Sequence, residues 1–479
     1  MKRTFTYLIL ALVILVAFGY YFINQYAYKL AEDMLYDLEP KIEGWFNKQT
    51  NYKSEKIHIT YDLASANIFK NIILENVELR NINDKITLDK LSLKIDDNNI
   101  NIKEAINLNY LLSDVRLEIN RFSINDLPLE ELSSDEPLSK LVFNDLKVEG
   151  LRHSRNEGLD GSMIIEEIGI NNIGNNSLNG FQIENMSFHL PELNLSIDKI
   201  YVDNFENFDS IIALANNNYE FYGLDNAHYQ NIMNYYGLNL FKVENISAKI
   251  NYLNKTNEIE IGIIELNIGR NDDNFLIADD ISAKLDKIRI PISIFDEYIN
   301  FDLYKNILSW NDELVLNLFT SLTGDTNNSS ARYETQFGVE KLGSINFNFD
   351  VGGYTDDFII NSLNNPYYYE TDEAHNDITL KAFDFMYIDE GLNELVLNEI
   401  DMSRQELQFY FDQTVSSSPL ISSKHKIQLI NAFENLMAGK RKVIIQFNSK
   451  YPNGIKATEL NFITYNNFER YGEFLIKVE

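Results

Sequence analysis

A six-residue phrase of apolar, polar, polar, apolar, polar and apolar residues returns along most of this chain and limits what the chain can fold into. The first copy reads Leu74-Glu75-Asn76-Val77-Glu78-Leu79. Further copies span residues 88–93, 143–148, 165–170, 183–188, 197–202 and 243–248, with a degenerate copy at 278–283. A match at 397–402 lies in a stretch of helical periodicity and is not a strand by this criterion. A phrase that recurs this often predicts an array of similar strands and not a compact active-site fold.

The phrase predicts a strand that carries a β-bulge. Side chains alternate between the two faces of a strand, so Met186 and Phe188 share a face and Ile183 is out of phase with them. One extra residue at the polar pair, Glu184 and Asn185, restores the phase, and a β-bulge supplies that residue. The alternative is a tight turn between two very short strands. Two-residue hairpins prefer a glycine that these pairs lack, which favours the bulge.

Strands bent at the same level form a curved, trough-like antiparallel sheet with one apolar face. The chain is therefore expected to be mainly β with some α, and this face is the candidate binding surface. The phrases predict that an apolar groove is lined by Val77, Leu79, Leu91, Leu93, Met186, Phe188, Ile200 and Val202.

Charge and cysteine content exclude several functions. The net charge is −31, from 72 acidic and 41 basic side chains. Such a surface repels nucleic acid and anionic headgroups, so we expect no nucleic-acid partner. The chain has no cysteine, which removes disulfides, thiolate catalysis, cysteine-ligated zinc and iron–sulfur clusters. Since exported proteins do not need disulfides, their absence does not argue against export.

The amino-terminal segment predicts a membrane anchor. Phe5 to Ile23 is nineteen residues without a charge, just long enough as a helix to cross a hydrocarbon core of about 30 Å. Lys2 and Arg3 precede it, so the short amino-terminal tail is expected in the cytoplasm and everything after the segment is expected to be exported. The alternative is a cleaved signal peptide, for which Ala17-Phe18-Gly19 is a poor cleavage site.

Pattern and composition divide the chain into five regions. The expected regions are 1–24 (tail and transmembrane anchor), 25–50 (juxtamembrane helix), 51–290 (repeated strands), 291–330 (helical insertion and linker) and 331–479 (α+β). Within the strand region, residues 204–237 have helix-like spacing. In the insertion, Leu314, Leu318 and Leu322 recur every four residues and predict a helix over 294–322. Residues 325–330 then resemble a linker.

The last third combines strands and helices. Alternating residues predict strands at 344–351, 380–387, 443–447 and 460–464. Asp389 and Ser403 are positioned to cap helices, the second running through Phe411. The clearest helix covers 423–438, with Gly439 as its stop.

No constellation identifies a reaction. The chain lacks a phosphate-binding glycine loop, a zinc-protease helix motif, a nucleophile elbow and a calcium loop. No two of its six histidines are three or four residues apart, so no helical metal pair is expected. Acidic pairs such as Asp272-Asp273 suit either a hard cation or a solvated edge that blocks aggregation. We expect no catalytic residue, no metal and no cofactor, although a spatially assembled triad leaves no sequence trace.

The plan of anchor, short helix and repeated strands resembles the bacterial AsmA/TamB-like envelope proteins. The resemblance runs from Lys2 to about Ile290 and is plainest in Pro40-Lys41-Ile42-Glu43, Ile57-His58-Ile59, Ile72–Leu79 and Ile86–Ile95. The YdgA-like periplasmic proteins have a similar length and plan. The resemblance implies a Gram-negative envelope, a sheet that forms a groove with an apolar interior, and handling of phospholipid. This chain departs from the larger members, because it is short and its last third is partly helical.

Three functions follow as hypotheses. The first is an inner-membrane-anchored periplasmic protein of envelope homeostasis that binds or transfers a phospholipid or acyl chain in its groove. The second is a non-enzymatic scaffold that binds an envelope protein, with the groove closed by the helices at 294–322 and 423–438. The third is an enzyme, which a deep pocket containing His228 or His375 with carboxylates would indicate.

Overall fold

The structure is a computed structural model that describes most of the strand-forming part of the chain. The described residues are 25–41, 43, 58–80, 84–96, 99–112, 115–128, 142–155, 161–174, 177–206, 239–252, 255–270, 278–292, 294, 313–364, 377–399, 402–418, 423–460 and 468–479. They belong to two compact units, residues 1–212 and 213–479, and each unit is described by itself. Both units are mainly β, as the sequence predicts.

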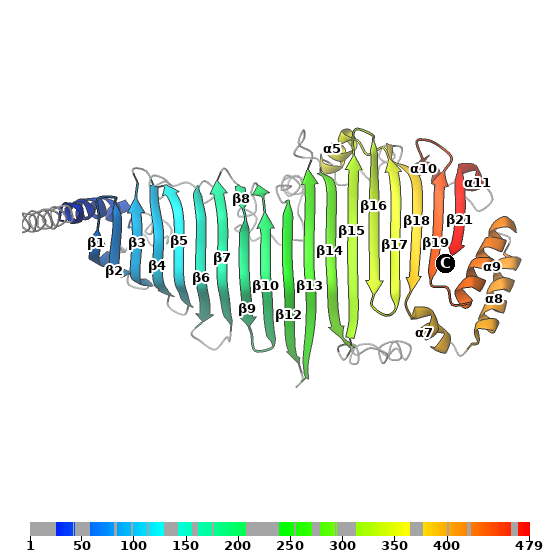
Figure 1. The fold of residues 1–479 in the computed structure, drawn as a ribbon, viewed down its shortest axis with the longest axis horizontal. Helices are drawn as coiled ribbons and strands as arrows, with labels where there is room; N and C mark the ends of the chain where they lie inside the picture. The colour runs from blue at the N-terminus through cyan, green and yellow to red at the C-terminus, as the bar shows by residue number, and fades with distance from the viewer. Residues whose placement is uncertain are drawn as a thin grey trace, which may run out of the picture. The chain divides into compact units, whose positions relative to one another are not determined.

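In the first unit the strands form an antiparallel sheet in chain order, with a helix over residues 25–41 (Figure 1). Each strand from β1 to β7 pairs with the next, β9 pairs with β7 and β10, and β8 pairs with β7 and β11. The strands are β1 (His58–Ala66), β2 (Asn71–Arg80), β3 (Asp84–Ile95), β4 (Asn99–Leu112), β5 (Val115–Pro128), β6 (Phe143–Arg155), β7 (Ser162–Gly174), β8 (Ser177–Asn179), β9 (Phe181–His189), β10 (Leu193–Asp203) and β11 (Phe205–Glu206).

The second unit continues the same up-and-down pattern and adds helices. Its strands are β12 (Leu240–Tyr252), β13 (Lys255–Arg270), β14 (Ala278–Pro291), β15 (Glu313–Asp325), β16 (Ser330–Val339), β17 (Gly343–Gly352), β18 (Thr379–Asp389), β19 (Lys442–Ser449), β20 (Ile455–Lys456) and β21 (Gly472–Val478). Its helices are α5 (Asp356–Asn364), α7 (Leu392–Glu399), α8 (Arg404–Ser417), α9 (Ser423–Met437), α10 (Ala457–Leu460) and α11 (Phe468–Tyr471).

The predicted bulge is confirmed. β2 is one continuous strand, and its register with β1 shifts between Thr60 and Asp62, opposite the polar pair. Asn76 takes the left-handed backbone conformation, with φ of 51°. Leu74 and Val77 are three residues apart, yet each is only 4% exposed and both line the same cavity. The extra residue therefore restores the phase and the turn alternative is wrong.

The bulged positions form one row across the first unit. In β2–β7, β9 and β10 the register leaves out a residue at this level: Asn76, Asp89, Asn107, Asn120, Gly150, Glu166, Asn185 and Asp198. Left-handed residues (Asn76, Asn107, Gly150 and Asn185) alternate with residues that have no positive φ. Asparagine and glycine suit these positions because they tolerate left-handed backbone better than other residues.

Hydrogen bonds connect members of this row between neighbouring strands. The Asn76 amide donates to Asp62 at 3.0 Å, and the Asn107 amide donates to Asp89 at 2.7 Å. The Asn185 amide donates to Glu166 at 2.5 Å. The polar pair of each phrase thus serves the backbone bend and its neighbour, which explains its polarity without a ligand.

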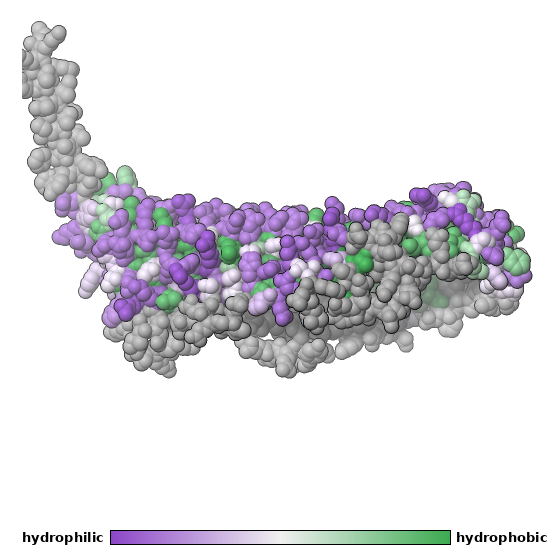
Figure 2. All heavy atoms as spheres, turned by 90° about the horizontal axis from the view of Figure 1, so that it is seen from below, coloured by the Kyte–Doolittle hydropathy of each residue, from purple (hydrophilic) through white to green (hydrophobic). Residues whose placement is uncertain are grey.

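The face opposite the apolar one is charged. Lys90 pairs with Glu104 at 3.0 Å, and Arg121 pairs with the same carboxylate at 3.0 Å. Farther along the sheet, Lys147 lies 3.0 Å from Glu149 and 3.1 Å from Glu167. Figure 2 looks along the strands from below, and in that view hydrophilic residues dominate among those described, with apolar ones in smaller patches. The ion pairs show that the sheet in β3–β7 has a charged face opposite its apolar one.

The helix predicted over 294–322 is wrong where the structure describes it. Residues 313–325 form β15, and the predicted linker at 325–330 is the turn of the β15–β16 hairpin. Leu314, Leu318 and Leu322 are an even number of residues apart, so their spacing suits one face of a strand as well as a helix. β14, β15 and β16 pair with one another in chain order.

Most predictions for the last third are confirmed. β17, β18 and β19 are strands, and the phrase-like segment after residue 392 is helical as far as Glu399. The Asp389 carboxylate accepts the Asn393 backbone N–H at 2.9 Å. Ser403 forms a capping box with Glu406, and α8 runs beyond Phe411 to Ser417. Gly439 follows α9 with φ of 92°.

Other predictions meet the limits of the described residues. The strand predicted at 460–464 is wrong at Leu460, which ends α10, and residues 461–464 lie outside the described part. The anchor at Phe5–Ile23 and nearly all of the helical segment at 204–237 also lie outside it. Among the helices described, none combines the length and apolarity needed to cross a membrane.

Candidate functional site

The first candidate site is an apolar cavity in the first unit, between the helix of residues 25–41 and the sheet. Ala27, Ala31, Leu35 and Leu38 are buried and spaced three or four residues apart, which places them on one face of the helix. This face packs against β1–β4 and completes a hydrophobic core. The cavity has a volume of about 240 Å³. Its lining comes from Leu35, Leu38, Glu39, Ile59, Tyr61, Leu74, Val77, Leu79, Ile86, Leu88, Leu91, Leu93, Ile102, Ala105, Leu108 and Phe122.

The structure brings together half of the predicted groove residues. Val77, Leu79, Leu91 and Leu93 all line this cavity. The other four, Met186, Phe188, Ile200 and Val202, lie on β9 and β10, are half-buried and are not part of it. The sequence analysis also missed the cover. The helix of residues 25–41 was expected only to leave the membrane, although its apolar stripe indicated that it packs on something.

One titratable pair adjoins the apolar lining. Burial and the nearby Glu39 carboxylate together raise the pKa of Tyr61 to about 12, with burial as the larger cause. Glu39 is the only charged residue in the lining, and the other lining residues apart from Tyr61 are aliphatic or phenylalanine. Such a lining suits a hydrocarbon chain.

The second candidate site is an aromatic row on the sheet of the second unit. Tyr333, Phe349, Phe383, Phe447 and Phe474 are aligned in register on β16, β17, β18, β19 and β21. The ring centroids of Tyr333 and Phe349 are 6.2 Å apart, and those of Phe349 and Phe383 are 5.1 Å apart. Tyr333 is 40% exposed, so the row is open at β16.

Helix α9 packs at the other end of this row. The His425 ring meets the Phe474 ring edge-on at a centroid distance of 5.8 Å, and His425 is only 4% exposed. Burial lowers the pKa of His425, although the Glu469 carboxylate, 3.6 Å from its Nδ1, opposes that shift. Of the two helices predicted to close the groove, α9 therefore makes a contact with the sheet, at β19 and β21.

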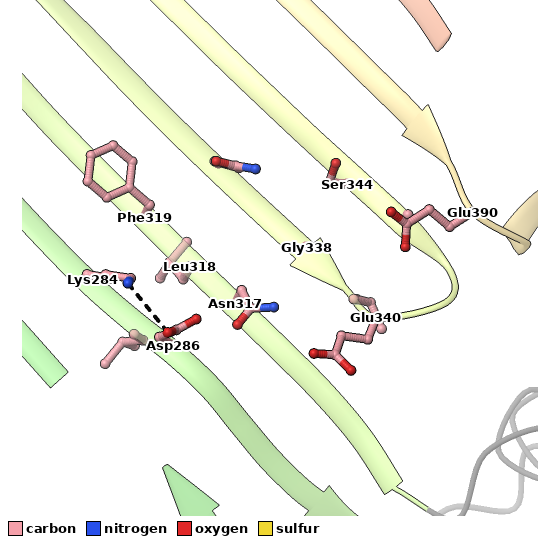
Figure 3. A pocket seen from close by; sticks show the side chains of 13 residues that line it. Lys284, Asp286, Asn317, Leu318, Phe319, Gly338, Glu340, Ser344 and Glu390 are labelled. Carbon is pink, nitrogen blue, oxygen red and sulfur yellow. Dashed lines mark ion pairs between the residues drawn. The ribbon is translucent and has the colours of Figure 1, made fainter. Parts of the chain in front are cut away.

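Two polar hollows lie in the second unit. One, of about 370 Å³, lies over β14–β17 where Gly338, Gly343 and Ser344 leave space (Figure 3). Lys284 and Asp286 face each other there at 3.4 Å. The other, of about 420 Å³, lies between α7 and the end of α9 and contains Arg404, Lys440 and Arg441.

Neither hollow contains a histidine, and nor does the apolar cavity. His228 and His375, which would have indicated an enzyme, lie outside the described residues. Within the described part of the chain, no group of three or more metal-ligating side chains is gathered. Asp272-Asp273 also lies outside that part, so the choice between cation and solvated edge stays open there.

Comparison with known proteins identifies no family. No family model matches the chain, and no curated protein matches it. A solved structure that matches in part is the in-vitro folded outer membrane protein OmpT of Vibrio cholerae, in its trimer form. The match has 6% identity and a TM-score of 0.17 over 70% of this chain and 84% of that one. A likeness this weak carries no argument about fold or function.

Proposed function

We propose that this protein binds acyl chains of lipids on the apolar side of its sheets, as an inner-membrane-anchored periplasmic protein of envelope homeostasis. The observation that carries the proposal is the cavity under the helix of residues 25–41, where one carboxylate is the only charge among sixteen lining residues. At about 240 Å³ it lies below the usual ~300–1,000 Å³ of small-molecule pockets, so it accommodates part of a lipid and not a whole one.

Sequence features support the cellular setting of this proposal. The uncharged segment Phe5–Ile23 is the single membrane span, and the residues after it are periplasmic. The resemblance to AsmA/TamB-like and YdgA-like proteins agrees with that setting. The aromatic row of the second unit offers a further apolar surface for lipid.

Photo-crosslinking tests the proposal at two adjacent residues that point to opposite faces. In the full chain expressed in bacteria, a benzophenone amino acid replaces Leu91, which lines the cavity, or Lys90, which pairs with Glu104 on the charged face. We expect phospholipid adducts by mass spectrometry at position 91 and several-fold fewer at position 90, since successive side chains alternate faces. Equal yields at both positions, or none at position 91, contradict acyl-chain binding.

A second candidate, a non-enzymatic scaffold, is favoured by the exposed face of the α8–α9 hairpin. Phe409, Tyr410 and Ile427 are 58%, 56% and 61% exposed. Exposed apolar groups of this kind are common at protein interfaces. Crosslinks from position 409 to an envelope protein, together with no lipid at position 91, would make the scaffold the better description.

A further inference from the structure

The loop between β1 and β2 presents two apolar side chains to solvent. Ile68 is 48% exposed and Phe69 is 70% exposed. The loop has a defined shape, because the Asn67 side-chain oxygen accepts the backbone N–H groups of Phe69 at 3.0 Å and Asn71 at 3.2 Å. The Lys70 N–H donates to the Asn67 carbonyl at 3.0 Å, with Lys70 in the left-handed conformation. These bonds hold Ile68 and Phe69 at the tip, away from the sheet.

The loop lies near the first turn of the helix of residues 25–41. The Tyr28 hydroxyl donates to the Ala64 carbonyl at 2.6 Å. Tyr28 belongs to that first turn, and Ala64 is two residues before the end of β1, where the loop begins. In the same turn, Tyr26 is 67% exposed. Three exposed apolar or aromatic side chains, Tyr26, Ile68 and Phe69, thus lie in the part of the unit around residues 25–28 of the helix.

The sequence in front of the helix indicates what covers this part. The uncharged segment ends at Ile23, two residues before residue 25, where the described part of the helix begins. If that segment spans a bilayer, the lipid surface lies within about one helical turn of Tyr26 and close to the loop. Aromatic and aliphatic side chains are enriched at this depth, where an apolar body meets a polar boundary.

We propose that the loop Asn67–Lys70 inserts Ile68 and Phe69 into the interfacial layer of the bilayer that holds the amino-terminal anchor. The inference rests on the proposed anchor and adds a second membrane contact, made by the sheet itself. The net charge of −31 gives no attraction to anionic headgroups, so the contact is apolar and insensitive to salt.

Single-cysteine labelling tests this contact, because the chain has no cysteine of its own. Phe69→Cys places a label at the loop tip, and Leu111→Cys places the matched control on a residue that is 45% exposed. The loop is hydrogen-bonded through Lys70 to Ile95, at the end of β3 that leads into the start of β4. Leu111 lies near the far end of β4, about 40 Å away at ~3.3 Å per residue.

The full chain is reconstituted in phosphatidylcholine vesicles with an environment-sensitive fluorophore on the cysteine and a nitroxide quencher on a fraction of the lipids. We expect quenching at position 69 to exceed that at position 111 at least threefold, and to be the same at 50 mM and 500 mM NaCl. Equal quenching at the two positions overturns the proposal, as does failure of the chain to float with the vesicles.

One more variant and the crosslinking experiment separate this proposal from acyl-chain binding. With the label at position 69, Ile68→Ser is expected to reduce the quenching, because the loop loses one of its two apolar side chains. Crosslinking of lipid at position 91 is measured alongside, in the chain that keeps Ile68. Lipid adducts without quenching at position 69 reject the loop contact alone, whereas quenching without adducts rejects the acyl-chain function alone.

Discussion

In the row of bulged positions that runs from Asn76 to Asp198, residues in alternate strands have a left-handed backbone, and the residue type at each of them decides how well the bend is tolerated. Asn76 and Asn185 were predictable, because each is the third residue of a phrase and asparagine tolerates this conformation. Gly150 was not predictable, since it lies just outside the phrase at 143–148. What requires glycine there is the neighbouring strand, where Asn120 fills the space that a side chain at position 150 would need.

Gly150→Ala is expected to destabilise the strands around it by about 2 kcal/mol, because alanine at φ of 66° is strained and its Cβ would lie 2.1 Å from the Asn120 amide nitrogen. Amide hydrogen exchange in β5–β7 measures the effect. Gly338→Ala is the control, since the nearest atom to its Cβ would be at 3.6 Å. A loss of protection in β15–β17 for the control equal to that in β5–β7 would show that glycine removal itself is responsible.

His425 predicts a pH dependence at the α9 contact. Because burial lowers its pKa in the folded state below the ordinary value near 6.5, the unfolded state binds a proton first as the pH falls. The stability of this contact is therefore complete above pH ~6.5 and is lost as the pH falls through the lowered pKa. Hydrogen exchange in α9 between pH 7.5 and 5 is the measurement. In His425→Gln the exchange of the α9 amides is expected to depend less on pH. If the pH dependence is unchanged in this variant, groups other than His425 cause it.

Among the elements, the helix of residues 25–41 has the largest consequence for the candidate site. Its existence follows from its apolar stripe, but the surface that it covers depends on contacts with β1–β5 that are distant in sequence. For β15 even the type of element was not predictable, because leucines four residues apart fit one face of a strand as well as one face of a helix. Only the ladder formed with β14 and β16 decides between the two.

Leu35→Ala is expected to destabilise the packing of this helix by about 2–5 kcal/mol, because Leu35 is 3% exposed and its removal enlarges the cavity. Tyr36→Ala is the control, since Tyr36 is 76% exposed and should change stability by less than ~0.5 kcal/mol. Amide hydrogen exchange in the helix and in β2–β3 is measured for both variants. Equal protection of these amides in Leu35→Ala and Tyr36→Ala would mean that the helix is held by something other than its apolar face.

For the molecule as a whole, the repeated phrase predicted the fold class but not the identity of a ligand. The phrase reports which side of a strand is apolar, and both units follow it. Whether that side is open or covered depends on helices whose positions the phrase does not encode, as the helix of residues 25–41 and α9 demonstrate. The described residues therefore give the sheets an apolar side, and what binds there stays a prediction.

Along the row from Asn76 to Asp198, strands with a left-handed residue at this level alternate with strands that have none. At the positions of this row, a residue with positive φ has a residue without positive φ in the strand on each side, so two left-handed residues of the row never lie in neighbouring strands. Removing one strand would place side by side two strands that both have, or both lack, a left-handed residue in this row. It would also reverse the direction of every strand that follows. Removing a hairpin of two would leave the order intact. A sheet of this kind can change length during evolution by pairs of strands, so its reach grows in steps of two strands, about 9–10 Å each.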